Sequence, residues 1–327
     1  MMDLPHPADD GKLRIIVICG PTAVGKTAAG IELARAVGGE IIGADSMQVY
    51  RHMDIGTAKP SAAEQAAVRH HLIDIVDPDA PFDAATYAAL GRRAAAEANR
   101  RSRTPVVVGG TGLYIKALLS GLFRSDARDP AVRSRLRAEA ESLGPAALHA
   151  RLGQHDPQTA ARLHPNDALR VLRALEVFEV TGRPLSELQQ EHRFADTPFR
   201  ALTIGLSMER EALYRRIDRR VEAMVAAGLE EEVRRLLAKG YGPELRPMQS
   251  IGYSHMAAFI AGSLSREECL RTLQRDTRRF AKRQMTWFRA DSQIVWSRPD
   301  RISEIGRLAR GYLLRPTPDS SGLPVAG

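Results

Sequence analysis

The sequence predicts an α/β fold in which a mostly parallel sheet is flanked by helices and interrupted by an all-helical insertion. Three observations predict it. A short β-branched run at 13–19 leads through a glycine-rich turn into a helical stretch at 27–37. Further apolar runs at 40–44 and 106–108 are typical of buried parallel strands. From about residue 125 to residue 199 such runs disappear, and helix formers and arginine dominate.

The first turn carries a phosphate-binding pattern. Its sequence, GPTAVGKT, fits G-x-x-x-x-G-K-[ST], the P-loop pattern. Because a strand precedes it and a helix follows it, backbone N–H groups and a helix N-terminus are aimed at phosphate. The pattern therefore predicts a P-loop NTPase-like core that binds a diphosphate or triphosphate, without naming a nucleotide or a reaction. Its residues are Gly20, Pro21, Thr22, Ala23, Val24, Gly25, Lys26 and Thr27.

Asp45 comes directly after the second predicted strand. Ligands of open α/β sheets lie outside the carboxyl ends of the strands, so this position places Asp45 near the phosphates. Two other interpretations stay open. Asp45 could cap the next turn, since aspartate is a preferred cap residue, or it could be a Walker-B-type ligand of Mg²⁺. The loop at 49–60 that follows is a good place for substrate contacts.

The third predicted strand, 106–108, leads into a second glycine-rich turn, Gly-Gly-Thr-Gly at 109–112, and a helix at 113–119. This turn also opens at the active edge of the sheet. No acidic residue follows the valine run, so the usual Walker B carboxylate is absent here. That absence argues against an ATPase or a motor protein.

We divide the chain into a first part of the core at 12–124, a helical insertion at 125–199, and a return to the core with C-terminal helices at 200–312. The segments 1–11 and 316–327 have the composition of disordered arms. Within the insertion, Arg170 and Arg173 are three residues apart and share one helix face, which is either a nucleic-acid contact or an ordinary solvated face.

The return to the core is expected to hold a strand at 201–206 and a long helical region at 210–239 with a break at Gly228. A short helical segment at 248–260 and a basic helix at 267–289 follow. Trp287 and Phe288 end the basic helix. They could stack on nucleic acid, or they could seal the helix onto the core.

Composition narrows the class of protein. With 47 basic and 39 acidic residues the formal charge is +8, which makes a polyanionic partner plausible. The two cysteines, Cys19 and Cys269, lie far apart and form no Cys/His cluster, which argues against a structural zinc site or a disulfide framework. No run reaches the length that spans a membrane, so we expect a cytoplasmic protein without membrane contact.

The motifs taken together are specific. In chain order they are GPTAVGKT at 20–27, DSMQVY at 45–50, MDIGTAKP at 53–60, GGTGLY at 109–114, HPND at 164–167, IGY at 251–253 and AKRQMTWFR at 281–289. This set closely resembles the bacterial tRNA dimethylallyltransferases, also called tRNA isopentenyltransferases, over about residues 12–300. The family moves a dimethylallyl group from dimethylallyl diphosphate to N6 of the adenosine just 3′ of the anticodon.

The resemblance implies roles for individual residues. The P-loop would hold the diphosphate of the donor, with Lys26 among the catalytic groups and Thr27 a ligand of the cofactor Mg²⁺. Asp45 would be the general base at N6, and Arg220, with Arg216 as rival, would assist the leaving diphosphate. The residues expected to contact the anticodon stem-loop of tRNA are Asp45, Ser46, Met47, Gln48, Thr111, Arg133, Leu169, Arg170, Val171, Leu172 and Arg173.

This chain departs from some family members at one place. Those members carry arginines that touch tRNA beside the Gly-Tyr motif, where this chain has Gln249, Ser250 and Ser254.

Three alternative functions also stay open. A free-adenylate isopentenyltransferase would need no large insertion, a small-molecule P-loop kinase would consume ATP, and an RNA-binding module without activity would explain neither the P-loop nor Asp45. We expect a monomer.

Overall fold

The structure is a computed structural model that describes residues 12–121, 129–192 and 198–314. The expected disordered arms at 1–11 and 316–327 lie outside the described residues. The chain forms two compact units. Unit 1 contains residues 1–119 and 198–327, and unit 2 contains residues 120–197, close to the insertion expected at 125–199.

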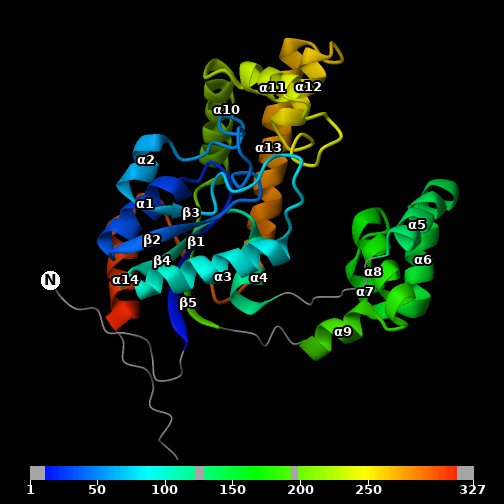
Figure 1. The fold of residues 1–327 in the computed structure, drawn as a ribbon, viewed down its shortest axis with the longest axis horizontal. Helices are drawn as coiled ribbons and strands as arrows, with labels where there is room; N and C mark the ends of the chain where they lie inside the picture. The colour runs from blue at the N-terminus through cyan, green and yellow to red at the C-terminus, as the bar shows by residue number, and fades with distance from the viewer. Residues whose placement is uncertain (1–11, 122–128, 193–197, 315–327) are drawn as a thin grey trace, which may run out of the picture. The chain divides into compact units, whose positions relative to one another are not determined.

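A six-stranded sheet in the order β3-β2-β4-β1-β5-β6 forms the centre of unit 1 (Figure 1). Every neighbouring pair is parallel, so all strands end at the same edge of the sheet. β1 and β4 are central and almost completely buried, which explains why their sequences are continuous apolar runs. The strands are β1 (Leu13–Cys19), β2 (Gly39–Ala44), β3 (His70–His71), β4 (Thr104–Gly109), β5 (Phe199–Leu206) and β6 (Val295–Ser297).

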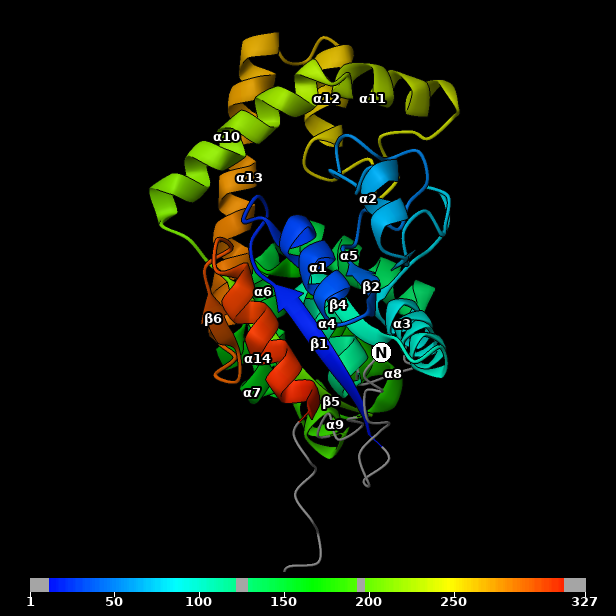
Figure 2. The same ribbon diagram turned by 90° about the vertical axis from the view of Figure 1, so that its left-hand side faces the viewer.

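Helices cover both faces of the sheet. α1 (Lys26–Ala36) and α14 (Ile302–Leu314) pack together on one face, and α3 (Ala84–Arg100) lies on the other, as Figures 1 and 2 show together. Two shorter helices, α2 (Ala62–Ala67) and α4 (Gly112–Ser120), complete this part. The strands expected at 13–19, 40–44, 106–108 and 201–206 and the helices expected at 27–37 and 113–119 are confirmed, apart from shifts of one or two residues at their ends. β3, α2 and α14 were not predicted.

Four C-terminal helices stand over the carboxyl edge of the sheet (Figure 2). They are α10 (Arg210–Ala226), α11 (Leu229–Ala238), α12 (Tyr253–Ile260) and α13 (Arg266–Arg289). The predicted break at Gly228 is confirmed, because this glycine has φ 98° and caps α11. The helical segment expected from residue 248 begins instead at Tyr253, because Gly252 with φ 100° directly precedes it.

Unit 2 consists of helices in the part that the structure describes. Its core is formed by apolar side chains of α5, α6, α7 and α8, including Leu136, Leu152 and Leu175. α5 begins at Pro130 after Asp129, whose carboxylate accepts from two backbone N–H groups. The helices are α5 (Pro130–Leu143), α6 (Pro145–His155), α7 (Pro157–Arg162), α8 (Ala168–Thr181) and α9 (Leu185–His192).

Within the described ranges, no helix is both long enough and apolar enough to cross a membrane.

Candidate functional site

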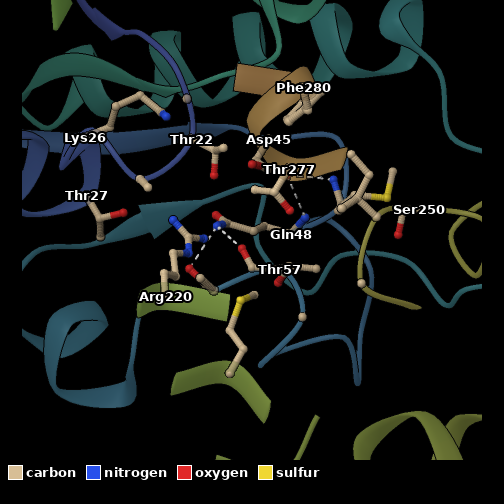
Figure 3. A pocket seen from close by; sticks show the side chains of 18 of the residues that line it. Thr22, Lys26, Thr27, Asp45, Gln48, Thr57, Arg220, Ser250, Thr277 and Phe280 are labelled. Carbon is tan, nitrogen blue, oxygen red and sulfur yellow. Dashed lines mark hydrogen bonds between the residues drawn. The ribbon is translucent and has the colours of Figure 1, made fainter. Parts of the chain in front are cut away.

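A cavity of about 830 Å³ lies in unit 1 at the carboxyl edge of the sheet. Its lining comes from the P-loop and the start of α1, from β2 and β4 and the segments that follow them, from α10 and α13, and from residues 249–253. Figure 3 shows side chains from these elements pointing toward one space. The residues that line the cavity include Thr22, Lys26, Thr27, Asp45, Ser46, Met47, Gln48, Thr111, Arg216, Arg219, Arg220, Thr277, Phe280, Arg283 and Gln284.

The P-loop forms one wall of the cavity. Gly20 has φ 141° and Gly25 has φ 106°, and only glycine adopts such angles at little cost. At Gly20 a Cβ atom would also lie 2.6 Å from the carbonyl oxygen of Leu206. The chain then enters α1 at Lys26, so the N–H groups of the first turn open onto the cavity.

Lys26 lies at the start of α1, and its Nζ donates to the carbonyl oxygen of Pro21 at 2.7 Å. Burial lowers the pKa of Lys26 to about 8; the negative charge of Asp45 acts against this and the positive charge of Arg220 adds to it. An anion in the cavity would favour the charged form of this lysine. The hydroxyl of Thr27, the next residue, lines the same cavity.

Asp45 follows β2, as the sequence predicted, and lines the same cavity as the P-loop. Its Oδ1 accepts from the N–H of Met47 at 2.9 Å and of Gln48 at 3.4 Å. The capping and the site interpretations of Asp45 are therefore compatible, because the turn uses Oδ1 while the residue faces the cavity. This turn fixes the carboxylate and makes Oδ2 the candidate proton acceptor.

Two arginines of α10 bring positive charge to the cavity. Burial lowers the pKa of Arg220, the charge of Asp45 opposes that shift, and Arg216 adds to it. The guanidinium of Arg216 lies beside the P-loop, 3.6 Å from where a Cβ of Gly25 would be. Arg220 and its rival Arg216 thus both face the site, so the structure retains both as partners of an anion.

The segment 46–60 forms a further wall. The N–H of Ser46 donates to Oγ1 of Thr111 at 3.0 Å, which joins this segment to the start of α4. Nε2 of Gln48 donates to the carbonyl oxygens of Thr57 at 3.1 Å and of Ala58 at 3.2 Å (Figure 3). Because both partners are acceptors only, the amide nitrogen must face them.

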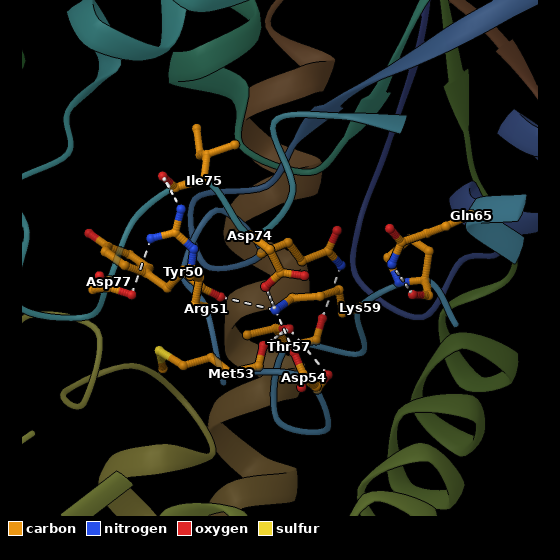
Figure 4. A network of polar contacts seen from close by, with 12 residues as sticks. Tyr50, Arg51, Met53, Asp54, Thr57, Lys59, Gln65, Asp74, Ile75 and Asp77 are labelled. Carbon is orange, nitrogen blue, oxygen red and sulfur yellow. Dashed lines mark hydrogen bonds and ion pairs between the residues drawn. The ribbon is translucent and has the colours of Figure 1, made fainter. Parts of the chain in front are cut away.

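Lys59 anchors the same segment through three contacts of its ammonium group. Its side chain is only 4% exposed, and Nζ contacts carboxylates of Asp54 and Asp74, each at 2.5 Å. It also donates to the carbonyl oxygen of Tyr50 at 3.0 Å. Figure 4 shows the three acceptors around the ammonium group. This loop, which the sequence indicated as a place for substrate contacts, is therefore an ordered wall.

Gln284 is a residue of the site that sequence reasoning missed. From α13 it accepts from the N–H of Thr22 at 2.8 Å and donates to the carbonyl oxygen of Gly110 at 2.9 Å. It thus links the two glycine-rich turns. Nearby, Phe288 is buried, and the indole of Trp287 lies against Gly112. The interpretation that the aromatic residues seal α13 onto the core is confirmed for Phe288, whereas Trp287 is 43% exposed and stacking on nucleic acid stays a prediction for it.

The remaining predicted contacts lie in unit 2. Arg133 is half-buried on α5, whereas Leu169 is 70% exposed on α8. Arg170 pairs with Asp167 at 2.8 Å and is largely exposed. Arg173 contacts the buried Glu176 at 2.9 Å.

The side chains of Val171 and Leu172 lie in the core of unit 2, because a helix of 3.6 residues per turn cannot expose five consecutive residues. RNA contact by this stretch stays a prediction, carried by Leu169, Arg170 and Arg173.

Comparison with known proteins adds the family. The model of the IPP transferase family matches residues 48–291. A tRNA dimethylallyltransferase of Desulfosudis oleivorans is 57% identical over 283 residues, which are 86% of this chain and 90% of that protein. One of Syntrophobacter fumaroxidans is 55% identical and covers 94% of this chain and 89% of its own.

Solved structures agree. The full-length tRNA isopentenylpyrophosphate transferase of Bacillus halodurans superposes with a TM-score of 0.70 at 42% identity, covering 92% of this chain and 97% of that one. A eukaryotic dimethylallyltransferase, solved acting on tRNA, gives a TM-score of 0.76 at 28% identity, covering 94% and 81%. The expected P-loop NTPase-like core is consistent with both.

Proposed function

The chain belongs to the IPP transferase family, and we propose that it is a tRNA modification enzyme, a tRNA dimethylallyltransferase. It transfers a dimethylallyl group from dimethylallyl diphosphate to N6 of the adenosine 3′ of the anticodon. The observation that carries this proposal is one cavity in which a P-loop, a carboxylate and two arginines face one another. A phosphate site next to a proton acceptor suits transfer from a diphosphate to an amine.

The P-loop side of the cavity holds the diphosphate. The N–H groups at the start of α1, Nζ of Lys26 and the guanidinium groups of Arg216 and Arg220 surround the place where negative charge grows as the carbon–oxygen bond breaks. Because the allylic carbon tolerates positive charge, stabilising the leaving diphosphate lowers the barrier directly.

The residues present also fit Mg²⁺. This cation prefers oxygen ligands, keeps several waters and commonly binds through one or two protein oxygens together with substrate phosphates. The hydroxyl of Thr27 at the mouth of the P-loop is such an oxygen, and it would hold the cation against the diphosphate. When bound, Mg²⁺ neutralises charge on the diphosphate.

Asp45 acts on the acceptor. The exocyclic amine of adenine is a poor nucleophile because its lone pair is delocalised into the ring. Oδ2 of Asp45 takes a proton from N6 as the N6–C1 bond forms and the C1–O bond of the donor breaks, and diphosphate leaves toward the P-loop. Oδ1 stays bonded to the turn at 46–48 and holds the carboxylate in place.

The tRNA is bound through two kinds of contact, one to the target base and one to backbone phosphates. The target base is stacked in the anticodon loop and must be flipped out, at a cost of about a few kcal/mol. Ser46, Met47, Gln48 and Thr111 then contact the base, while basic residues of α13 and unit 2 bind phosphates and offset that cost. The enzyme works as a cytoplasmic monomer on the anticodon stem-loop.

The test is transfer of label from radiolabelled dimethylallyl diphosphate with Mg²⁺ to unmodified tRNA or to AMP. We expect label in tRNA, at the adenosine beside the anticodon. Label in AMP would instead assign the chain to the free-nucleotide branch. Label in neither, together with ATP turnover, would support a small-molecule kinase.

The Asp45→Asn variant tests the base. It should bind tRNA like the wild type and lose most turnover, by about 10²–10⁴-fold, the usual contribution of a general base. Weak tRNA binding combined with normal single-turnover chemistry would contradict this assignment.

Unit 2 is tested by salt. Replacing Arg133 and Arg170 with glutamine should weaken tRNA binding and reduce the slope of log affinity against log salt by roughly one for each phosphate that is no longer bound. An unchanged slope would mean that these arginines do not bind phosphate.

A further inference from the structure

Glu232 of α11 is a buried carboxylate that binds the backbone of residues 54–56, which belong to the segment that forms the cavity wall around Gln48. Its side chain is 3% exposed. Oε2 accepts from the N–H groups of Asp54 at 3.0 Å and Ile55 at 2.8 Å. Oε1 accepts from the N–H of Gly56 at 3.1 Å and from Oη of Tyr253 at 2.6 Å. Four neutral donors therefore fill the four acceptor positions of one carboxylate.

Tyr253 closes this arrangement from α12. A Cβ atom on Gly56 would lie 2.4 Å from Cε2 of the tyrosine ring, so the ring is in direct contact with the backbone of the turn. Burial, together with the charge of Glu232, raises the pKa of Tyr253, which keeps its hydroxyl a donor. Residues 54–56 are thus fixed by two helices that are distant in the sequence.

The turn continues directly into the groups that orient Gln48. The N–H of Ala58 donates to the carbonyl oxygen of Ile55 at 2.9 Å. Ala58 has φ 46°, an angle that residues other than glycine rarely adopt and that persists only where surrounding contacts impose it. The carbonyls of Thr57 and Ala58 then hold Nε2 of Gln48. Lys59 restrains the far end of the same turn (Figure 4).

We propose that Glu232 is a positioning residue for the acceptor side of the reaction. Through residues 54–56 it sets the two carbonyl groups that orient the amide of Gln48 in the cavity. This inference rests on the proposed function, since Gln48 lines the part of the cavity assigned to the base. Glu232 touches neither substrate and acts only through the turn. The diphosphate side is formed by other segments, so the two substrates should respond differently.

The first test is Glu232→Gln, assayed for tRNA prenylation. The amide nitrogen of glutamine would face N–H or O–H donors and break part of the arrangement. We expect KM for tRNA to rise roughly 10-fold, as loss of hydrogen bonds to a charged group implies, with KM for dimethylallyl diphosphate within about twofold of wild type. The matched control is Glu231→Gln, the same charge change on the exposed neighbour, which should leave both values unchanged.

A double-mutant cycle separates positioning from general stability. If Glu232 acts through Gln48, Gln48→Ala and Glu232→Gln together should raise KM for tRNA no more than Gln48→Ala alone. Effects that multiply would overturn the proposal, as would equal rises in the KM of both substrates.

Two results keep the outcomes distinct. Should Glu232→Gln fail to fold, Tyr253→Phe removes one of the four donors and keeps the ring; it should raise KM for tRNA roughly threefold, since one hydrogen bond is removed. An unchanged KM for tRNA in that variant would contradict the proposal. If the wild type does not prenylate tRNA at all, the proposed function fails. If it does and Glu232→Gln behaves like wild type, only this inference fails.

Discussion

The two glycine-rich turns of unit 1 are alike in sequence, but their glycines serve different purposes. Both begin where a central parallel strand ends, and the last residues of β1 and β4, Cys19 and Gly109, are partners across the sheet. Both lead into a helix. The turn at 20–27 presents Lys26 and Thr27 to the cavity, whereas the turn at 109–112 is filled by side chains of α13.

The glycines show why. Gly20 and Gly25 have positive φ, so the first turn needs glycine for its backbone angles. Gly110 and Gly112 do not belong to the positive-φ glycines; a Cβ atom there would lie 2.4 Å from Nε2 of Gln284 and 2.1 Å from Nε1 of Trp287. The second turn therefore needs glycine for the close approach of a helix. Glycine thus serves the backbone angles of the first turn and the packing of the second, although Thr111 of the second turn also lines the cavity.

The largest effect expected from this comparison is the loss of activity when Lys26, which carries the positive charge of the P-loop, is replaced. Lys26→Met should lower kcat/KM by about 10²–10³-fold, as removal of one donor to a developing charge does. The free energy of unfolding should stay equal or rise, because a costly buried charge is removed. Steady-state kinetics and denaturant unfolding check both; a loss below about tenfold would mean that the lysine is not essential to the turn.

Gln284, which joins the two turns, should affect stability and donor binding together. Gln284→Leu keeps the volume but leaves the N–H of Thr22 and the carbonyl of Gly110 without their partner, at a cost of about 1–3 kcal/mol. KM for the donor should rise as well. The control is Gln274→Leu on the same helix, where the side chain contacts Glu222 at the surface. An unchanged donor KM would show that the turns are independent.

Replacing the glycines should separate space from backbone angle. Gly112→Ala should destabilise by about 1–3 kcal/mol through overpacking, and Trp287→Ala should relieve that loss. Gly25→Ala should cost about 1–2 kcal/mol because its φ is 106°. Arg216→Ala should not relieve it, since the nearest atom is already 3.6 Å away. Thermal unfolding of the four single and two double variants measures these losses of stability. If the second substitution restored stability in both pairs, lack of space rather than backbone angle would explain both glycines.

The smallest expected effect is a pH dependence confined to the first turn. Because the pKa of Lys26 is lowered to about 8, affinity for inorganic pyrophosphate should fall as pH rises above that value. Measuring the affinity of wild type and of Lys26→Met by calorimetry allows the contribution of the titration of pyrophosphate itself to be subtracted.

The free energy of unfolding should change with pH in the opposite direction. Between about pH 8 and the ordinary lysine pKa of 10.5 the unfolded chain binds more protons, so the free energy of unfolding should rise with pH.

Local pattern was sufficient for much of the fold and part of the site. The strand at 13–19, the P-loop, the strand at 40–44 and Asp45 at its end follow from short runs whose periodicity and order determine structure locally. Parallel pairing then brings the carboxyl ends of these strands to one edge. Glu232 and Gln284 could not be found this way, because each is one polar residue in an ordinary helix and its partners lie far along the chain.

By itself, then, the sequence determined most of the strands and helices, the phosphate-binding turn and the carboxylate beside it, since these depend on neighbouring residues and on a rule common to all parallel sheets. Only the tertiary structure decided that the second glycine turn packs against α13, that Gln48 is oriented by Thr57 and Ala58, and that Val171 and Leu172 are buried. One such contact, between Thr22 and Gln284, joins residues 262 positions apart. Such contacts depend on which helix packs on which strand end, and no local pattern encodes that choice.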